Sequence, residues 1–75
     1  MQVIVNNVFL SLNDEEEKLE YKLAKILRIQ KEEIESYKII KKAVDARKKQ
    51  NIIFVYSLLV TLKHNIDISS YKDVS

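Results

Sequence analysis

An alternating apolar run near the C-terminal end of the chain limits its fold more than any other feature. One set of side chains is wholly apolar and the interleaved set is mixed: Ile52, Phe54, Tyr56, Leu58, Val60 and Leu62, then Ile53, Val55, Ser57, Leu59 and Thr61. A period of two is that of a β-strand, and an apolar run on both sides is typical of a strand inside a sheet. The sequence therefore predicts a central strand over residues 51–62, which needs a neighbour on each side.

Two other segments supply candidate neighbours for this strand. Residues 2–11 are β-prone, and the apolar positions change parity at Asn6-Asn7, which indicates a bulge or a late start of the strand. Residues 36–44 carry lysines on both faces, a pattern that favours an edge strand because lysines there discourage aggregation. We expect these two strands to flank the central one.

A helix is expected between the first two strands, beginning at Asn13. Asparagine is a preferred N-cap, and Glu16 stands where a capping box needs it. Asp14 and Lys18 have the spacing of an ion pair along a helix. The acidic run of residues 14–17 could be imagined as a metal site, but consecutive carboxylates on a helix diverge, so a solvated first turn is the favoured interpretation. The apolar stripe of this helix is Leu19, Leu23, Ile26 and Leu27.

The order of elements predicts an α+β fold of the type β-α-β-β. A short helical turn over residues 30–33, held by Ile29 and Ile34, connects the helix to the second strand. A right-handed crossover favours a ferredoxin-like split β-α-β with one helix on a three-stranded mixed sheet. In this arrangement the third strand lies between the others, parallel to the first and antiparallel to the second. Residues 1–62 form one small domain, and residues 63–75 form a tail, as a short helix or a partly ordered segment.

Several classes of site are excluded by what the 75-residue chain lacks. It has no cysteine for a disulfide or a thiolate zinc site. It has no glycine, so it holds neither a P-loop nor a dinucleotide fingerprint. Its one histidine, His64, is expected to be exposed at a strand end, and no catalytic or metal-binding residue is assigned. The chain shows no signal peptide and no apolar run long enough for a bilayer, so we expect a cytoplasmic protein without membrane contact.

The segment between the second and third strands concentrates positive charge. From Lys38 to Lys49 there are six cations and one acid, Asp45, a net charge of +5. Such a hairpin could bind a phosphate backbone, with log K falling against log salt at a slope of roughly −4.5. No aromatic residue interleaves the cations, and the glycines of an RNA-recognition motif are absent. A solvated lysine-rich hairpin is the plainer interpretation. Asp45 and Arg47 would point to the same side of an extended segment and could dock the turn on a neighbour.

The same segment resembles a known family. The stretch from Tyr37 to Lys49, with Val44-Asp45-Ala46-Arg47-Lys48-Lys49 as its core and Ile53-Phe54-Val55-Tyr56 after it, is similar to the N-terminal region of bacterial FAD-dependent oxidoreductases. These are described as uncharacterised NAD(FAD)-utilising dehydrogenases. The resemblance spans about residues 2–62, and Ala43 departs from the serine expected there. It implies a flavoprotein parent whose FAD-binding domain lies downstream, and no cofactor-binding residue in this chain.

Three hypotheses follow from the sequence. The leading one is a non-catalytic accessory domain that docks on or regulates a downstream flavin-binding domain of the same chain. The alternatives are a small nucleic-acid-binding module that uses the basic hairpin and a protein-interaction domain that pairs through a strand edge. The residues assigned to the interaction surface are Lys41, Lys42, Asp45, Arg47, Lys48 and Lys49.

Overall fold

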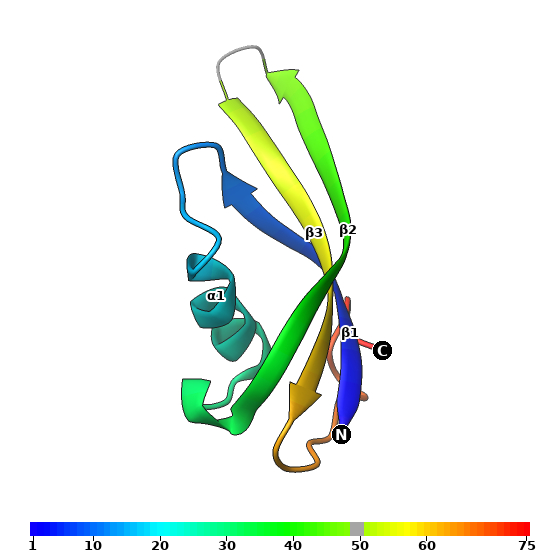
Figure 1. Cartoon of the computed structure of the whole chain (residues 1–75). Helices are drawn as coiled ribbons and strands as arrows, with labels where there is room; N and C mark the ends of the chain where they lie inside the picture. Colours follow the sequence, from blue (N-terminus) through cyan, green and yellow to red (C-terminus); the bar gives the residue numbers. More distant parts are fainter. Residues whose placement is uncertain (49–50) are drawn as a thin grey trace.

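Three strands form one antiparallel sheet in the order β1-β3-β2 (Figure 1). The computed structural model describes residues 1–48 and 51–75, with side chains for residues 1–45 and 52–75. The elements are β1 (Gln2–Ser11), α1 (Lys18–Leu27), the 3-10 turn η1 (Lys31–Glu33), β2 (Ile34–Lys48) and β3 (Asn51–Leu62). The three expected strands, the single α-helix and the short turn are therefore confirmed.

β3 is the central strand, as predicted, but its expected parallel pairing with β1 is wrong. Val3 faces Val60 and Val5 faces Leu58 in an antiparallel register, so the sheet is not mixed. The physical reason lies in the two connections. The crossover through α1 returns the chain so that β2 runs in the direction of β1. The β2–β3 hairpin then reverses it, which makes β3 antiparallel to both neighbours.

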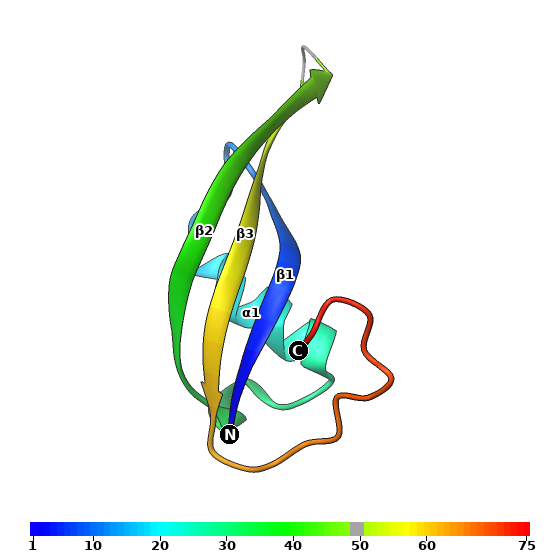
Figure 2. The same ribbon diagram turned by 90° about the vertical axis from the view of Figure 1, so that its right-hand side faces the viewer.

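The core lies between α1 and one face of the sheet (Figures 1 and 2). Leu19, Leu23 and Leu27 recur along one side of α1 and are fully buried, whereas Ile26 of the predicted stripe is partly exposed. The sheet contributes alternate residues of β1 and β3, in keeping with the period of a half-buried strand. These are Val3, Val5, Val8, Leu10, Tyr56, Leu58, Val60 and Leu62.

A bulge in β1 explains the parity change of its apolar residues. The register shifts between Val5 and Val8, and Asn7 takes a positive φ of 57°. Asparagine tolerates this left-handed conformation better than most residues. The extra residue allows both Val5 and Val8 to face the core, so the bulge predicted at Asn6-Asn7 is confirmed.

α1 begins at Lys18 and not at Asn13, so the predicted N-cap is wrong. Asp14 binds backward instead, because its carboxylate accepts the Ser11 amide at 3.3 Å while its own amide donates to the Ser11 carbonyl at 3.0 Å. These bonds fold residues 11–14 into a turn that precedes the helix. The predicted Asp14–Lys18 ion pair is confirmed, with 2.8 Å between its charged atoms.

The tail after β3 is ordered but contains no helix. Val74 is buried and forms an isolated bridge with Val5 at the outer edge of β1. The amides and carbonyls of Ile4 and Ser75 exchange hydrogen bonds of 2.8 and 2.9 Å. The Tyr71 hydroxyl donates to the Leu27 carbonyl at 2.8 Å, which fastens the tail to the end of α1. His64 is exposed just beyond β3, as expected.

Candidate interaction surface

The face of the sheet opposite α1 carries exposed apolar side chains. Figure 2 looks onto this uncovered face, with α1 behind the sheet. Phe9 and Ala43 both pair with Val55, and Ile4 pairs with Leu59, so these side chains share one face. Phe9 is 51% exposed, and Val55 and Leu59 are half-buried. We name this surface the uncovered face and define it by Ile4, Phe9, Ala43, Ile53, Val55 and Leu59.

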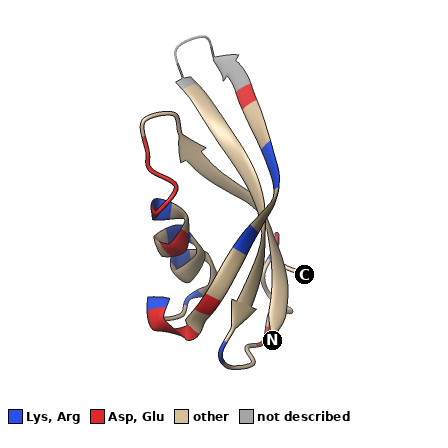
Figure 3. Ribbon diagram, in the orientation of Figure 1, with Lys and Arg blue, Asp and Glu red and all other residues tan. Residues whose placement is uncertain are grey.

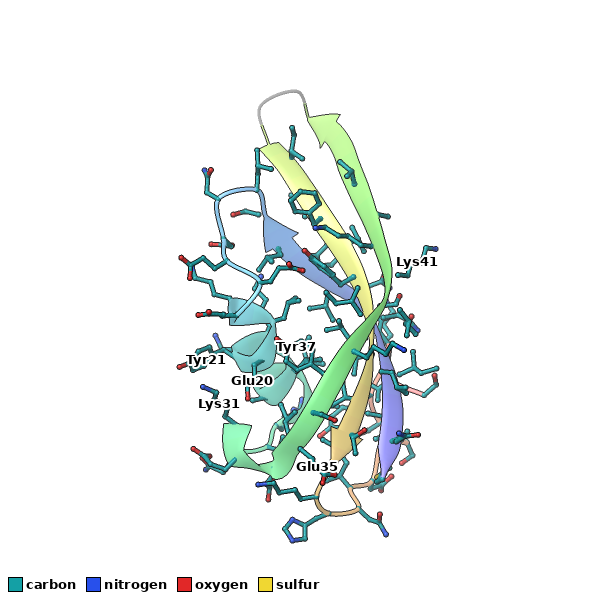
Figure 4. The ribbon with its side chains drawn as sticks, in the orientation of Figure 1. Glu20, Tyr21, Lys31, Glu35, Tyr37 and Lys41 are labelled. Carbon is teal, nitrogen blue, oxygen red and sulfur yellow. The ribbon has the colours of Figure 1, made fainter. Side chains whose placement is uncertain are left out.

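The predicted cation cluster is divided between the two faces of the sheet. Lys41 pairs with Ser57 on the uncovered face, and its side chain points away from α1 (Figure 4). Lys42 pairs with Tyr56 and therefore lies on the face that α1 covers. A bulge between Ile39 and Lys41 adds one residue, which reverses the parity expected for the second half of β2. Neighbouring lysines of one strand thus cannot act as one patch.

The other predicted residues lie towards the hairpin tip. Asp45 is half-buried and pairs with Ile53, which puts it on the same side as Lys41. A further register shift separates Asp45 from Lys48. The side chains of Arg47, Lys48 and Lys49 lie outside the described residues. The Asp45–Arg47 pair expected from their spacing therefore stays a prediction.

Lys42 contacts two aromatic rings, an arrangement that the sequence analysis missed. Its Nζ lies 4.6 Å from the ring centroid of Phe54 and 5.5 Å from that of Tyr56. The Tyr56 hydroxyl in turn donates to a Glu16 carboxylate oxygen at 3.5 Å. A cation over a ring contributes about 0.5–1 kcal/mol at an exposed site. Cross-strand pairing could have revealed this contact, but only with the bulge in β2 placed correctly.

A second row of cations, also missed, runs along the outer side of α1 (Figure 3). Lys18, Lys22 and Lys25 have the spacing of one helix face and line a shallow open hollow together with Tyr21. Two of these three lysines make contacts within the chain. Lys18 is paired with Asp14, and the Lys22 ammonium donates to the Phe9 carbonyl. This row therefore fixes the loop before α1 and the edge of β1.

Lys31 fastens η1 to the outer side of α1 (Figure 4). Its Nζ lies 4.4 Å from the ring centroid of Tyr21 and 4.0 Å from a Glu20 carboxylate oxygen. A hydrogen bond with the Tyr21 hydroxyl, and then the negative charge of Glu20, raise the pKa of Lys31. Tyr37 of β2 packs against the core. Burial raises the pKa of Tyr37, and nearby glutamates add to the effect. The arrangement is a structural clamp.

Within residues 1–48 and 51–75, no three histidine, cysteine, aspartate or glutamate side chains gather as a metal site would need. In the same part of the chain, no helix has the length and apolar content to cross a membrane.

Comparison with known proteins identifies the family of the chain. Residues 1–61 match a domain of unknown function, DUF8436. The chain belongs to this family. An uncharacterized protein of Clostridium beijerinckii is 43% identical over 63 residues, which cover 84% of this chain but only 12% of that protein. The chain thus corresponds to a small part of this relative's length. No solved structure matches the chain significantly.

Proposed function

We propose that this DUF8436 domain is a non-catalytic docking domain that packs its uncovered face against another domain of the same polypeptide. The exposed apolar side chains of the uncovered face carry the proposal. Phe9 stands out from this face with about half of its surface in water, beside half-buried Val55. Exposed apolar side chains that gather on one face mark interaction sites in proteins.

The Clostridium relative supports the choice of a domain in the same polypeptide. The matched region is 12% of that protein, so most of its chain lies outside the part that resembles this domain. A small domain that buries little of its own surface gains stability when a neighbour covers its apolar face. Docking within one chain also avoids the translational entropy that a separate partner would lose.

Charge insertion on the uncovered face tests this proposal. Phe9→Glu is compared with Tyr21→Glu, because Tyr21 is a similarly exposed aromatic residue at 62% and lies on α1. In the 75-residue chain we expect both variants to remain folded. In the protein expressed from its complete coding sequence, only Phe9→Glu should free the domain, seen as faster limited proteolysis at its boundary. Equal proteolysis of both variants, or a coding sequence that ends at Ser75, would overturn the proposal.

The identity of the neighbouring domain is a separate proposal. The sequence resemblance implies a flavin-dependent oxidoreductase, with FAD held by a domain downstream of this one. The path of β1, α1 and β2 around β3 also supports classing the domain with ferredoxin-like split β-α-β folds. The complete protein, purified and reconstituted with FAD, should then show flavin absorbance. Absence of bound flavin would remove the oxidoreductase proposal and leave the docking proposal standing.

Nucleic-acid binding is the second candidate function. The +5 charge between Lys38 and Lys49 favours it, whereas the placement of Lys41 and Lys42 on opposite faces weakens it. The double variant Arg47→Ala with Lys48→Ala should weaken RNA or DNA binding and flatten its dependence on salt. Failure of the parent chain to bind either polymer at low salt would eliminate this function.

A further inference from the structure

The two edges of the sheet are treated differently by the rest of the chain. Along β1, the outward backbone groups of Ile4 and Asn6 bind the tail at Ser75 and Asp73. The Phe9 carbonyl accepts a hydrogen bond from the Lys22 ammonium. Ser11 exchanges hydrogen bonds with Asp14. The chain therefore covers the β1 edge almost along its length, which prevents another strand from pairing there.

β2 presents an open edge of unusual length. It runs over 15 residues, from Ile34 to Lys48, and pairs only with β3 in the part of the chain that the structure describes. The Leu12 amide donates to the Ile52 carbonyl, and the Leu62 amide donates to the Met1 carbonyl. The backbone hydrogen-bonding groups of even-numbered β3 residues therefore face β1, and those of odd-numbered residues face β2. Alternation along the β2 ladder then directs the backbone groups of four residues outward. These residues are Tyr37, Ile39, Lys42 and Val44.

The charges on this edge discriminate between possible strands. Lys38, Lys41 and Lys42 lie within five residues without an acid among them. All three are exposed. A second copy paired antiparallel about Lys41 would bring these cations together, and like charges on paired strands are destabilising. A strand that carries carboxylates would instead form cross-strand ion pairs with the same residues.

We propose that the β2 edge binds an extended acidic segment of another polypeptide as a fourth strand of the sheet. The backbone groups of Ile39, Lys42 and Val44 supply the main-chain hydrogen bonds. Lys38 and Lys41 select for carboxylates on one face of the added strand, and Lys42 does so on the other. This mode of recognition is strand addition, in which the main chain gives affinity and side chains give specificity. It goes beyond the docking proposed for the uncovered face and uses a different surface.

The opposing interpretation is that the lysines merely prevent aggregation. Edge lysines do so in many proteins. That role alone predicts no binding of any strand, acidic or basic. Strand addition predicts instead that binding follows both the sign of the charge and the availability of outward amides. These two dependences can be separated with peptides and variants.

The test uses a short synthetic peptide of alternating glutamate and valine, added to the 75-residue chain at low salt. Binding is followed by fluorescence anisotropy of the labelled peptide and by amide chemical shifts. We expect binding about tenfold tighter than for the matched lysine–valine peptide, because the cross-strand ion pairs with Lys38 and Lys41, which share one face of β2, change sign. The largest shifts should lie along β2. Methylating alternate peptide amides should abolish binding, since that removes the hydrogen bonds and keeps the charge.

One pair of variants at Val44 and one charge-reversed double variant locate the site. Val44 is 60% exposed and its amide faces outward, so Val44→Pro removes one edge donor without breaking the ladder to β3. It should reduce binding, whereas Val44→Thr should not. Lys38→Glu with Lys41→Glu should reverse the preference from the acidic to the basic peptide, because these two residues share one face of β2. Circular dichroism verifies that each variant is folded, and the charge-reversed chain keeps the test decisive if the proline variant unfolds.

Four outcomes would overturn the proposal. The first is that neither peptide binds. The second is that the methylated peptide binds as well as the parent peptide, which would indicate a purely electrostatic contact. A homodimer that Val44→Pro dissolves would show that a second copy occupies the edge. Preference for a polyphosphate or RNA over the acidic peptide would assign the cations to nucleic acid. The Phe9→Glu variant should bind the acidic peptide normally, so failure of the docking proposal and failure of this one are distinguishable.

Discussion

Arg28 occupies a backbone conformation that its side chain does not favour. It follows the last residue of α1 with φ 57° and ψ 43°, in the left-handed region. Its amide donates to the carbonyls of Ala24 and Lys25, which closes the helix. A residue with a Cβ atom loses about 1–2 kcal/mol in this conformation, whereas glycine does not. The chain contains no glycine, so a helix end that commonly uses one is closed here by arginine.

Substitution at Arg28 should therefore invert the usual helix ranking. Within a helix, glycine is about 1 kcal/mol less favourable than alanine. At this left-handed position we expect Arg28→Gly to be more stable than Arg28→Ala by about 1 kcal/mol. Both variants lose the guanidinium, which lies 5.9 Å from the ring centroid of Tyr71, so that contact cancels in the comparison. Urea unfolding followed by circular dichroism measures the difference; a more stable alanine variant would contradict the expected backbone strain.

At the scale of elements, the period of the apolar residues predicted the strand whose burial enforces alternation, β3. It failed in β2, where a bulge adds one residue. β3 begins at Asn51 and ends at Leu62 as expected, because burial requires strict alternation along it. The bulge after Ile39 carries no such signal, since β2 is an edge strand with exposed side chains on both faces. One extra residue there sent Lys42 to the face opposite the one expected. The bulge thus exchanged the faces of Lys41 and Lys42, and the alternation of adjacent strand residues divides the predicted interaction surface.

The start of α1 shows the same limit. Asn13 and Glu16 matched a capping box, but α1 begins only at Lys18, and Asp14 binds back to Ser11. A local sequence pattern cannot tell which of two nearby backbone amides a carboxylate will bind, because the carboxylate can accept a hydrogen bond from either. The direction of β3 relative to β1 likewise depends on two connections together, the crossover through α1 and the β2–β3 hairpin. The fold class followed from the sequence, and the strand directions did not.

The turn before α1 should give the protein a pH dependence at low pH. Hydrogen bonds from Lys18 and then Ser11 lower the pKa of Asp14 from 3.8 to about 2. A carboxyl with a lowered folded pKa stabilises the protein above its unfolded pKa, and this contribution is lost as pH falls through the folded value. The melting temperature of the parent should therefore exceed that of Asp14→Asn at pH 5, and the gap should close between about pH 4 and pH 2.

Direct titration provides the control for this prediction. The Asp14 carboxyl, followed by NMR, should titrate near pH 2 in the parent chain. Lys18→Met removes the largest cause of the shift, so the midpoint should move towards the ordinary value. A gap in melting temperature that stays constant with pH would show that Asp14 acts through the turn geometry of its side chain and not through its charge.

At the scale of the whole molecule, the C-terminal tail packs against β1, so the two ends of the chain are paired. Val74 is 9% exposed against Val5, and the backbones of Ile4 and Ser75 are paired. The Asn7 amide also donates to the Asp73 carboxylate at 3.1 Å. The tail thus covers both core surface and the β1 edge, and β2 is left as the edge that another strand can reach.

Removal of residues 73–75 should accordingly change both stability and association. The loss of a buried valine and of several hydrogen bonds should lower the free energy of unfolding by roughly 2–4 kcal/mol. The exposed β1 edge should then pair between copies, because that edge lacks the lysines that protect β2. Urea unfolding and light scattering coupled to gel filtration measure the two effects, with Lys72→Ala as an exposed neighbour that should change neither. A truncated chain that unfolds at the parent's urea concentration and stays monomeric would show that the tail does not guard the β1 edge, and would remove the asymmetry on which strand addition at β2 is argued.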